Sequence, residues 1–173
     1  MKILVFSDSH STLRFMKAYI EAFSPDAVVH LGDHYEDGQT IRQMYSISRF
    51  YQVPGNCDKY RIFMPVAETL VEKVCGVKLF MTHGHNQHVK MGLGSLLAQA
   101  RRTDAQAVLF GHTHEAYCQQ EEDRLWVINP GSCGFGGGSA ALLEVDQGKI
   151  TACRILRQAD LDDITSAEGK PGQ

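Results

Sequence analysis

Potential metal ligands follow the predicted strands of the first two-thirds of the sequence, and each motif stands at the C-terminal tip of its strand. In an open α/β sheet, ligands bind at the carboxyl ends of the strands. Five separate segments would therefore deliver aspartate, asparagine and histidine side chains to one edge. In chain order the motifs are Asp8-x-His10, Gly32-Asp33, Gly55-Asn56-Cys57-Asp58, His83-Gly84-His85 and Gly111-His112-Thr113-His114.

The spacing within these motifs suits convergence on a metal ion. Residues i and i+2 of an extended chain point the same way, so Asp8 and His10 are expected to face one ion. His112 and His114 either do the same or turn apart to serve two ions. The four glycines beside the ligands predict close backbone approach or positive φ; they stand at positions 32, 55, 84 and 111.

The types of ligand indicate which ions could bind and how many. Carboxylate, amide and imidazole ligands without thiolates favour Mn²⁺, Fe or Zn²⁺ over Cu(I) or an iron–sulfur cluster. One catalytic zinc takes three protein ligands plus water, whereas two ions about 3.5–4 Å apart that share one carboxylate would use a larger set. Two divalent cations with two aspartates leave the site net positive, which suits a phosphate ester. The predicted ligands are Asp8, His10, Asp33, Asn56, His83, His112 and His114.

Composition excludes several other classes of protein. The 173 residues carry 17 Lys+Arg, 20 Asp+Glu and a formal charge of −3, so no general basic field is available for a long nucleic acid. No apolar run approaches the roughly 18 residues of a membrane span. The five cysteines are scattered without a CxxC motif and are interpreted as reduced thiols of a cytoplasmic protein; they are Cys57, Cys75, Cys118, Cys133 and Cys153.

Strand-like and helix-like segments alternate in the first part of the chain, and hairpins dominate the second. Helices are expected at 11–23, with Ser11 or Thr12 as N-cap, and at 38–46 and 89–102. This order predicts an α/β fold with mixed sheets and helices outside, formed by one domain at 1–160 and followed by a polar, loose tail at 161–173. Strands are expected at 2–7, 27–31, 49–53, 68–74, 77–82, 107–110, 116–120, 125–128, 140–145 and 149–156.

The ordered motifs resemble the calcineurin-like metallophosphoesterase superfamily over roughly residues 1–156, and the short chain resembles its small bacterial and archaeal phosphodiesterase branch. The resemblance implies a four-layer αββα sandwich of two mixed sheets. It also implies hydrolysis of small phosphate diesters by in-line attack of a metal-bridging hydroxide. Asp8, His10, Asp33 and His114 would hold the first ion. Asp33 would bridge to a second ion completed by Asn56, His83 and His112. Mn²⁺ is the first choice, with Zn²⁺, Fe or Ni²⁺ as alternatives.

One position departs from the family pattern. Many members have Gly-Asn-His, whose histidine assists the leaving group, where this chain has Cys57. A thiol is a weaker proton donor near neutral pH, so substrates with good leaving groups are favoured. Asp58 or His85 could partly substitute. Asn56 and His83 are predicted to be catalytic as well as ligands, because they fix the geometry.

Two other functions stay open from the sequence. A eukaryotic trafficking subunit of the same fold acts as a protein-binding scaffold, and the complete ligand set argues against that role here. A nuclease of the superfamily is disfavoured by the acidic balance. The expected partner is a small phosphate ester, without a long nucleic acid or a membrane, and a homo-oligomer is left open. The Gly-Phe-Gly-Gly-Gly segment at 134–138 is interpreted as a flexible loop, since no Walker lysine follows it.

Overall fold

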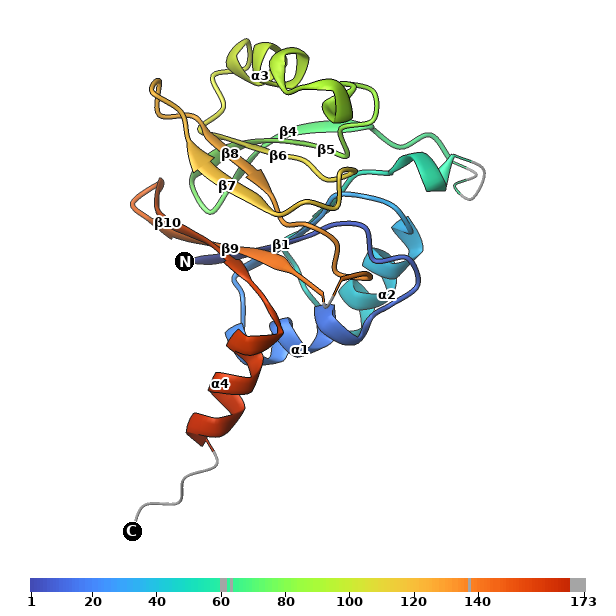
Figure 1. Cartoon of the computed structure of the whole chain (residues 1–173), viewed down its shortest axis with the longest axis vertical. Coiled ribbons are helices and arrows are strands. Elements are labelled where there is room, and N and C mark those ends of the chain that lie inside the picture. The colour runs from blue at the N-terminus through green and yellow to red at the C-terminus, as the bar shows by residue number, and fades with distance from the viewer. Residues whose placement is uncertain (60–61, 63, 137, 169–173) are drawn as a thin grey trace.

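Two five-stranded β-sheets stack face to face, and helices cover the outer side of each (Figure 1). The computed structural model describes residues 1–59, 62, 64–136 and 138–168. In Figure 1 the layers follow one another from α3, through the two sheets, to α1, α2 and α4. The α/β fold with two mixed sheets between helices is confirmed.

The first sheet has the strand order β10-β9-β1-β2-β3. β1, β2 and β3 run parallel, whereas β9 and β10 are antiparallel to their neighbours. Helices α1 (Arg14–Phe23) and α2 (Tyr35–Met44) connect the three parallel strands. Their carboxyl ends therefore meet at one edge. The strands are β1 (Lys2–Phe6), β2 (Ala27–His30), β3 (Phe50–Gln52), β9 (Ala140–Asp146) and β10 (Lys149–Leu156).

The second sheet has the order β4-β5-β6-β8-β7. Its three central strands β5, β6 and β8 are parallel, and the two edge strands are antiparallel. Helix α3 (Gly94–Arg101) connects β5 to β6 and covers the outer face. The strands are β4 (Thr69–Val74), β5 (Val77–Thr82), β6 (Ala107–Leu109), β7 (Tyr117–Gln120) and β8 (Trp126–Asn129).

The period of two along the central strands explains the layered core. In β1, Ile3 and Val5 point between the two sheets, whereas Leu4 and Phe6 point to the outer face, which α1 and α2 cover. All four side chains are fully buried. A strand buried on both faces needs apolar residues at every position, which is why the β1 segment is continuously apolar.

Two of the predicted helices differ from the observed ones at their N-terminal ends. α1 begins at Arg14 instead of residue 11, because Ser11 has φ 67° and its N–H donates to Asp37. The predicted N-cap at Ser11 or Thr12 is therefore wrong. The helix expected at 89–102 is divided into a 3₁₀ turn (Val89–Met91) and α3, with Gly92 at φ 136° between them.

The C-terminal segment is helical where a loose tail was predicted. α4 spans Gln158–Glu168, and residues 169–173 lie outside the described part of the chain. Leu161 packs into the cluster beneath the first sheet, and the Asp160 carboxylate accepts the Arg157 N–H at 2.6 Å. One apolar residue and one cap thus hold the first turn of a polar helix. No described helix has the length and apolarity to cross a membrane.

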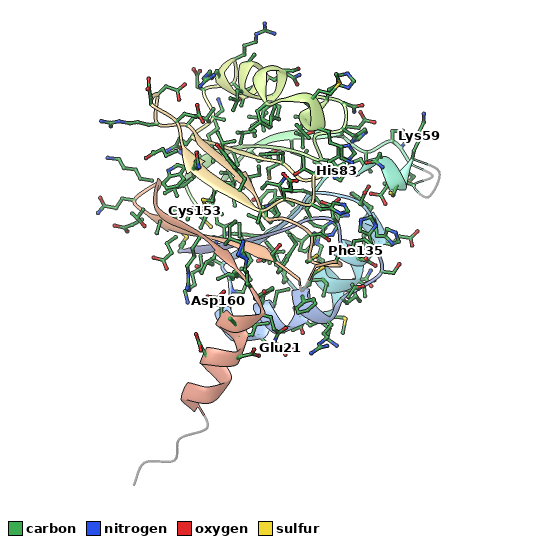
Figure 2. The ribbon with its side chains drawn as sticks, in the orientation of Figure 1. Glu21, Lys59, His83, Phe135, Cys153 and Asp160 are labelled. Carbon is green, nitrogen blue, oxygen red and sulfur yellow. A yellow bond between two sulfur atoms is a disulfide. The ribbon has the colours of Figure 1, made fainter. Side chains whose placement is uncertain are left out.

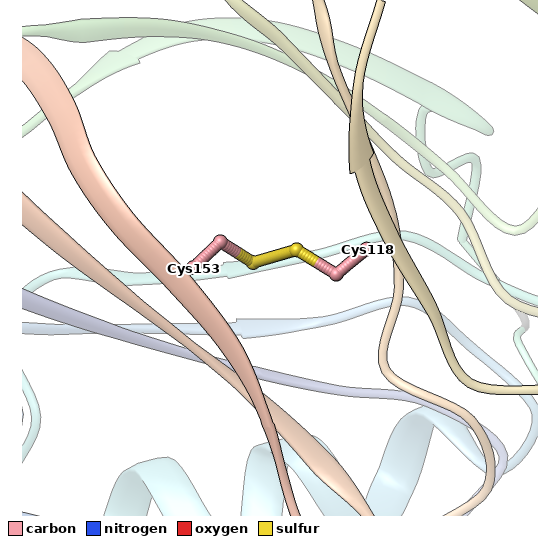
Figure 3. Close-up of a disulfide and its surroundings, with 2 residues drawn as sticks. All are labelled: Cys118 and Cys153. Atoms are coloured by element: carbon pink, nitrogen blue, oxygen red, sulfur yellow. A yellow bond between two sulfur atoms is a disulfide. The ribbon is translucent and has the colours of Figure 1, made fainter.

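Cys118 on β7 and Cys153 on β10 form a disulfide between the two sheets (Figure 3). Their Cα atoms are 6.8 Å apart, although 35 residues separate them in sequence. The interpretation of these two cysteines as reduced thiols is therefore wrong, because the stacking of the sheets brings distant strands together. Cys57, Cys75 and Cys133 are free. The cytoplasmic location inferred from reduced thiols stays a prediction.

Reduction of this disulfide is expected to destabilise the fold. Opening a loop of 35 residues restores unfolded-state entropy equivalent to about 3–4 kcal/mol in the chain-entropy model. Urea unfolding with and without dithiothreitol measures the difference. The double variant C118S/C153S provides the control, because a reductant should not change its unfolding midpoint. Equal midpoints for the oxidised and reduced wild type would contradict this expectation.

Candidate metal centre

The loops after β1, β2, β3, β5 and β6 converge at one end of the paired sheets. Figure 2 shows His83 and Phe135 toward this end, with Cys153 on the other side of the molecule. One group of ligand atoms, each from a different side chain, lies within 4.8 Å of every other member of the group. This group consists of Asp8, His10, Asp33 and His114.

Asp8 is a buried carboxylate directed at the histidines. Its Oδ1 lies 3.1 Å from His114 Nε2 and 4.0 Å from His83 Nε2, and its Oδ2 accepts the His112 N–H at 3.1 Å. Oδ1 is buried without a hydrogen-bond donor. Buried polar atoms without partners are rare in proteins, and an oxygen in this position, facing imidazole nitrogens, suits a metal ion.

Asp33 stands between two groups of ligands. Its Oδ1 accepts the Cys57 N–H at 2.9 Å and lies 3.6 Å from His83 Nε2, whereas its Oδ2 lies 3.9 Å from His10 Nε2. Burial raises the pKa of Asp33, but the neighbouring His83 and the hydrogen bond from Cys57 outweigh it and lower the pKa overall. Asp33 is therefore an ionised carboxylate with one oxygen toward each group.

The second group contains Asn56, His83 and His112. His83 is fully buried, and its Nδ1 lies 2.7 Å from the carbonyl oxygen of Leu31, which identifies Nδ1 as the protonated nitrogen. Nε2 is then the free nitrogen, 3.1 Å from Asn56 Oδ1. The rings of His83 and His112 are 5.1 Å apart. All seven predicted ligands thus lie at the same end of the sheets.

The backbone of the site is unusual. Five of the seven predicted ligands have left-handed φ between 45° and 68°, which costs non-glycine residues energy and is concentrated at functional sites in proteins. The expected extended i, i+2 geometry is therefore wrong, and tight turns bring these side chains together instead. The His112 ring turns toward His83, and the His114 ring toward His10 at 5.3 Å. The five residues are Asp8, His10, Asp33, His112 and His114.

Glycines permit the close approach of chain segments around the carboxylates. A Cβ on Gly55 would lie 2.2 Å from Asp33 Oδ1, and a Cβ on Gly111 would lie 1.9 Å from Ser7 Oγ and 2.8 Å from Asp8 Oδ2. Gly32 and Gly84 have φ of 97° and 106°. The expectation of close approach or positive φ at these four glycines is confirmed.

The pKa values of His10 and His112 are lowered, which favours the neutral imidazole that a metal ion binds. Burial lowers the pKa of His10, even though the nearby carboxylates of Asp33 and Asp8 raise it. Burial and the neighbouring His83 lower the pKa of His112 to about 4. A metal ion binds the neutral form of imidazole, so at neutral pH neither side chain has to lose a proton before binding.

Three residues are candidates for the general acid that a histidine provides in many family members, and their surroundings differ. Cys57 is exposed as a residue, but its sulfur is partly buried. This partial burial and the nearby Asp33 carboxylate raise the pKa of the Cys57 thiol to about 11. The Asp58 carboxylate is buried and accepts N–H groups of His34, Tyr35 and Gly55. These bonds make Asp58 a residue that positions the loop, and its contacts lend no support to proton transfer.

His85 is the candidate with an unused polar atom. Its ring lies 5.4 Å from that of His83, and its Nδ1 is buried without a hydrogen-bond partner. Burial and His83 lower the pKa of His85. His85 and Asn56 also line a cavity of about 460 Å³ beside the ligands, so His85 is placed to contact a bound molecule.

Sequence reasoning missed two features of the site. Ser9 Oγ donates to Asp37 at 2.7 Å and lies 3.1 Å from Nε2 of the buried His30, which links the β1 and β2 loops. Phe135 contacts two ligand rings, although the sequence predicts only a flexible loop there; its ring centroid is 4.7 Å from that of His10 and 5.8 Å from that of His114. No local pattern identifies either feature, because the partners lie 21 to 125 residues away.

Comparisons with known proteins show which family and fold the chain is similar to. The family model of the calcineurin-like phosphoesterase superfamily domain matches residues 1–148. A phosphodiesterase of Methanocaldococcus jannaschii is 30% identical over 149 residues, which cover 77% of this chain and 84% of that protein. A "Probable metallophosphoesterase" of Mycoplasma pneumoniae is 28% identical over 159 residues, or 87% and 93% of the two chains. Wild-type Vps29 of Entamoeba histolytica, complexed with Zn²⁺, shares the fold with a TM-score of 0.67 and 21% identity, over 91% of this chain and 99% of that one.

Proposed function

Because the chain belongs to the calcineurin-like phosphoesterase superfamily, we propose that it is a dinuclear metal-dependent phosphoesterase that hydrolyses small phosphate diesters. The observation that carries the proposal is the position of Asp33, whose two oxygens face His83 and His10 respectively. One carboxylate shared between two ligand groups is the arrangement that a two-metal hydrolase needs.

The residues present fit two ions. Asp8, His10, Asp33 and His114 would hold the first, and Asp33, Asn56, His83 and His112 the second. Oxygen and neutral imidazole ligands without thiolates suit Mn²⁺, with Zn²⁺, Fe or Ni²⁺ as alternatives. When bound, such ions activate water and neutralise charge on a phosphoryl group.

The chain's own side chains would orient the substrate and the ligands. The hydrogen bond from His83 Nδ1 to Leu31 fixes its ring, and the bond from the Cys57 N–H fixes Asp33. Fixed geometry lowers the barrier because little reorganisation accompanies the reaction. The Cys57 thiol keeps its proton at neutral pH, but an S–H group is a weak hydrogen-bond donor. Substrates with good leaving groups are therefore favoured.

Two observations favour diesters over monoesters. Cavities of about 460 Å³ and 330 Å³ each share residues with the ligand cluster, Asn56 for the first and His114 for the second. A diester has two organic arms to place, whereas a monoester has one. The relative from M. jannaschii carries the name phosphodiesterase.

We expect no long nucleic acid or membrane as a partner, and a homo-oligomer is left open.

An assay with matched esters tests the proposal. With Mn²⁺ supplied, the protein should hydrolyse bis(p-nitrophenyl) phosphate faster than p-nitrophenyl phosphate and should lose activity in EDTA. Metal analysis should give about two ions per chain. Bound metal without turnover of any ester would favour the protein-binding scaffold instead. Binding of long nucleic acid with a steep salt dependence would favour a nuclease.

A further inference from the structure

A cavity of about 330 Å³ extends from the ligand cluster toward the start of α4. It borders His114 of the first ligand group, whereas the cavity of about 460 Å³ borders Asn56 of the second group. A molecule whose phosphorus sits at the ligands would reach this cavity with one of its arms. Its walls include His114, Ser132, Phe135, Ser139, Arg157 and Gln158.

Phe135 presents an open aromatic face in this cavity. Its ring stacks on that of His114, with an angle of 18° between the planes and 5.8 Å between centroids, and it also contacts His10. Even so, 56% of the side chain is exposed. An aromatic ring of this kind stacks favourably on another planar ring.

The loop that carries Phe135 is anchored to the metal-ligand loop. Ser132 Oγ donates to the carbonyl oxygen of Asp8 at 2.8 Å and accepts the N–H groups of Gly134 and Phe135. The Gly134 N–H donates to the same carbonyl at 3.1 Å, and a Cβ on Gly134 would lie 2.3 Å from the Ser9 carbonyl oxygen. Residues 134 and 135 of the segment expected to be a flexible loop are therefore hydrogen-bonded to the Asp8 loop, whereas residue 137 lies outside the described part of the chain.

Arg157 provides a positive charge on another wall of the cavity. Its side chain is exposed, and within the described part of the chain no carboxylate oxygen lies within ion-pair distance of its guanidinium group. Ser132 Oγ and Ser139 Oγ already donate to the carbonyl oxygens of Asp8 and Pro130. The cavity therefore combines an aromatic face with an unpaired cation that suits an anion.

We propose that this cavity binds a nucleoside arm of the diester, with its base stacked on Phe135 and a further phosphate on that arm paired with Arg157. The inference rests on the proposed function and names its substrate class, a small diester with a nucleotide arm. Stacking on an aromatic ring tolerates any base, so the identity of the base matters less than its planarity.

Three esters with the same p-nitrophenolate leaving group separate the contribution of Phe135 from that of Arg157. They are methyl p-nitrophenyl phosphate, the p-nitrophenyl ester of thymidine 5′-phosphate, and the same thymidine ester with a 3′-phosphate. F135L should lower the ratio of kcat/KM for the thymidine ester over the methyl ester about tenfold, because it keeps apolar bulk without a ring to stack. R157Q should leave that ratio unchanged. It should lower only the ratio of kcat/KM for the thymidine ester with the 3′-phosphate over the thymidine ester without it, by about tenfold. R154Q, which changes a neighbouring exposed arginine outside the cavity, should change neither ratio.

A binding measurement separates failure of this inference from failure of the proposed chemistry. Calorimetry with thymidine 3′,5′-bisphosphate should show binding to the wild type, weakened about tenfold in F135L and in R157Q. Hydrolysis of all three esters with ratios and binding unchanged in both variants would overturn the nucleotide cavity and leave the phosphodiesterase intact. Normal binding without hydrolysis of any ester would overturn the proposed chemistry and support the cavity.

Discussion

Replacement of Asp33 by alanine is expected to lower turnover of bis(p-nitrophenyl) phosphate by about 10³-fold or more while the chain stays folded. Asp33 turns a different carboxylate oxygen toward each ligand group, with Oδ1 at 3.6 Å from His83 Nε2 and Oδ2 at 3.9 Å from His10 Nε2. Its loss would remove a ligand from each ion and one negative charge from between them. Steady-state kinetics at saturating Mn²⁺, with circular dichroism of the same samples, measure both parts of the expectation.

Two further variants separate the ligand role of Asp33 from its structural role. D33N keeps an oxygen that can accept the Cys57 N–H, so it should be more stable than D33A and equally inactive. D26N changes an aspartate at the opposite end of β2, where Asp26 accepts the Lys2 N–H, and should keep wild-type turnover. Near-normal turnover of D33A would show that the carboxylate does not bridge two ions.

The layered fold was predictable because its signals are local. Continuous apolar runs such as that of β1 are typical of strands buried on both faces, and alternation with amphipathic segments indicates helices outside the sheets. The Cys118–Cys153 disulfide was not predictable, since its partners lie on strands of different sheets. The polar composition of α4 concealed a helix that Leu161 anchors to the core.

The site was predictable in its residues and not in its backbone. Polar side chains at the ends of parallel strands must share an edge, which is why distant motifs converge. The left-handed turn at Asp8 and His10 depends on contacts with other loops, including the bond from the Ser11 N–H to Asp37. The wall formed by Phe135 arises from a loop more than a hundred residues from His10, and no local pattern encodes that distance.

The two ligand groups predict that single histidine variants lose one ion each. H114A removes the nitrogen 3.1 Å from Asp8 Oδ1, and H83A removes the nitrogen 3.1 Å from Asn56 Oδ1. Each variant should retain about one Mn²⁺ per chain where the wild type binds about two, and each should lose turnover by about 10²-fold or more, because a two-metal site needs both ions. Mass spectrometry of dialysed protein measures the metal, and the diester assay measures turnover.

The controls make the assignment of each ligand separately testable. H88N replaces an exposed histidine at φ 55°, a conformation that asparagine tolerates, and should keep both ions and full turnover. The double variant H83A/H114A should bind neither ion tightly, since each group then lacks a histidine. If H83A keeps two ions, His83 is not a ligand, and the same outcome for H114A would remove His114 from the first group. A variant that keeps both ions and still loses turnover would place its histidine in contact with the substrate, because its effect would then act on the reaction and not on the metal.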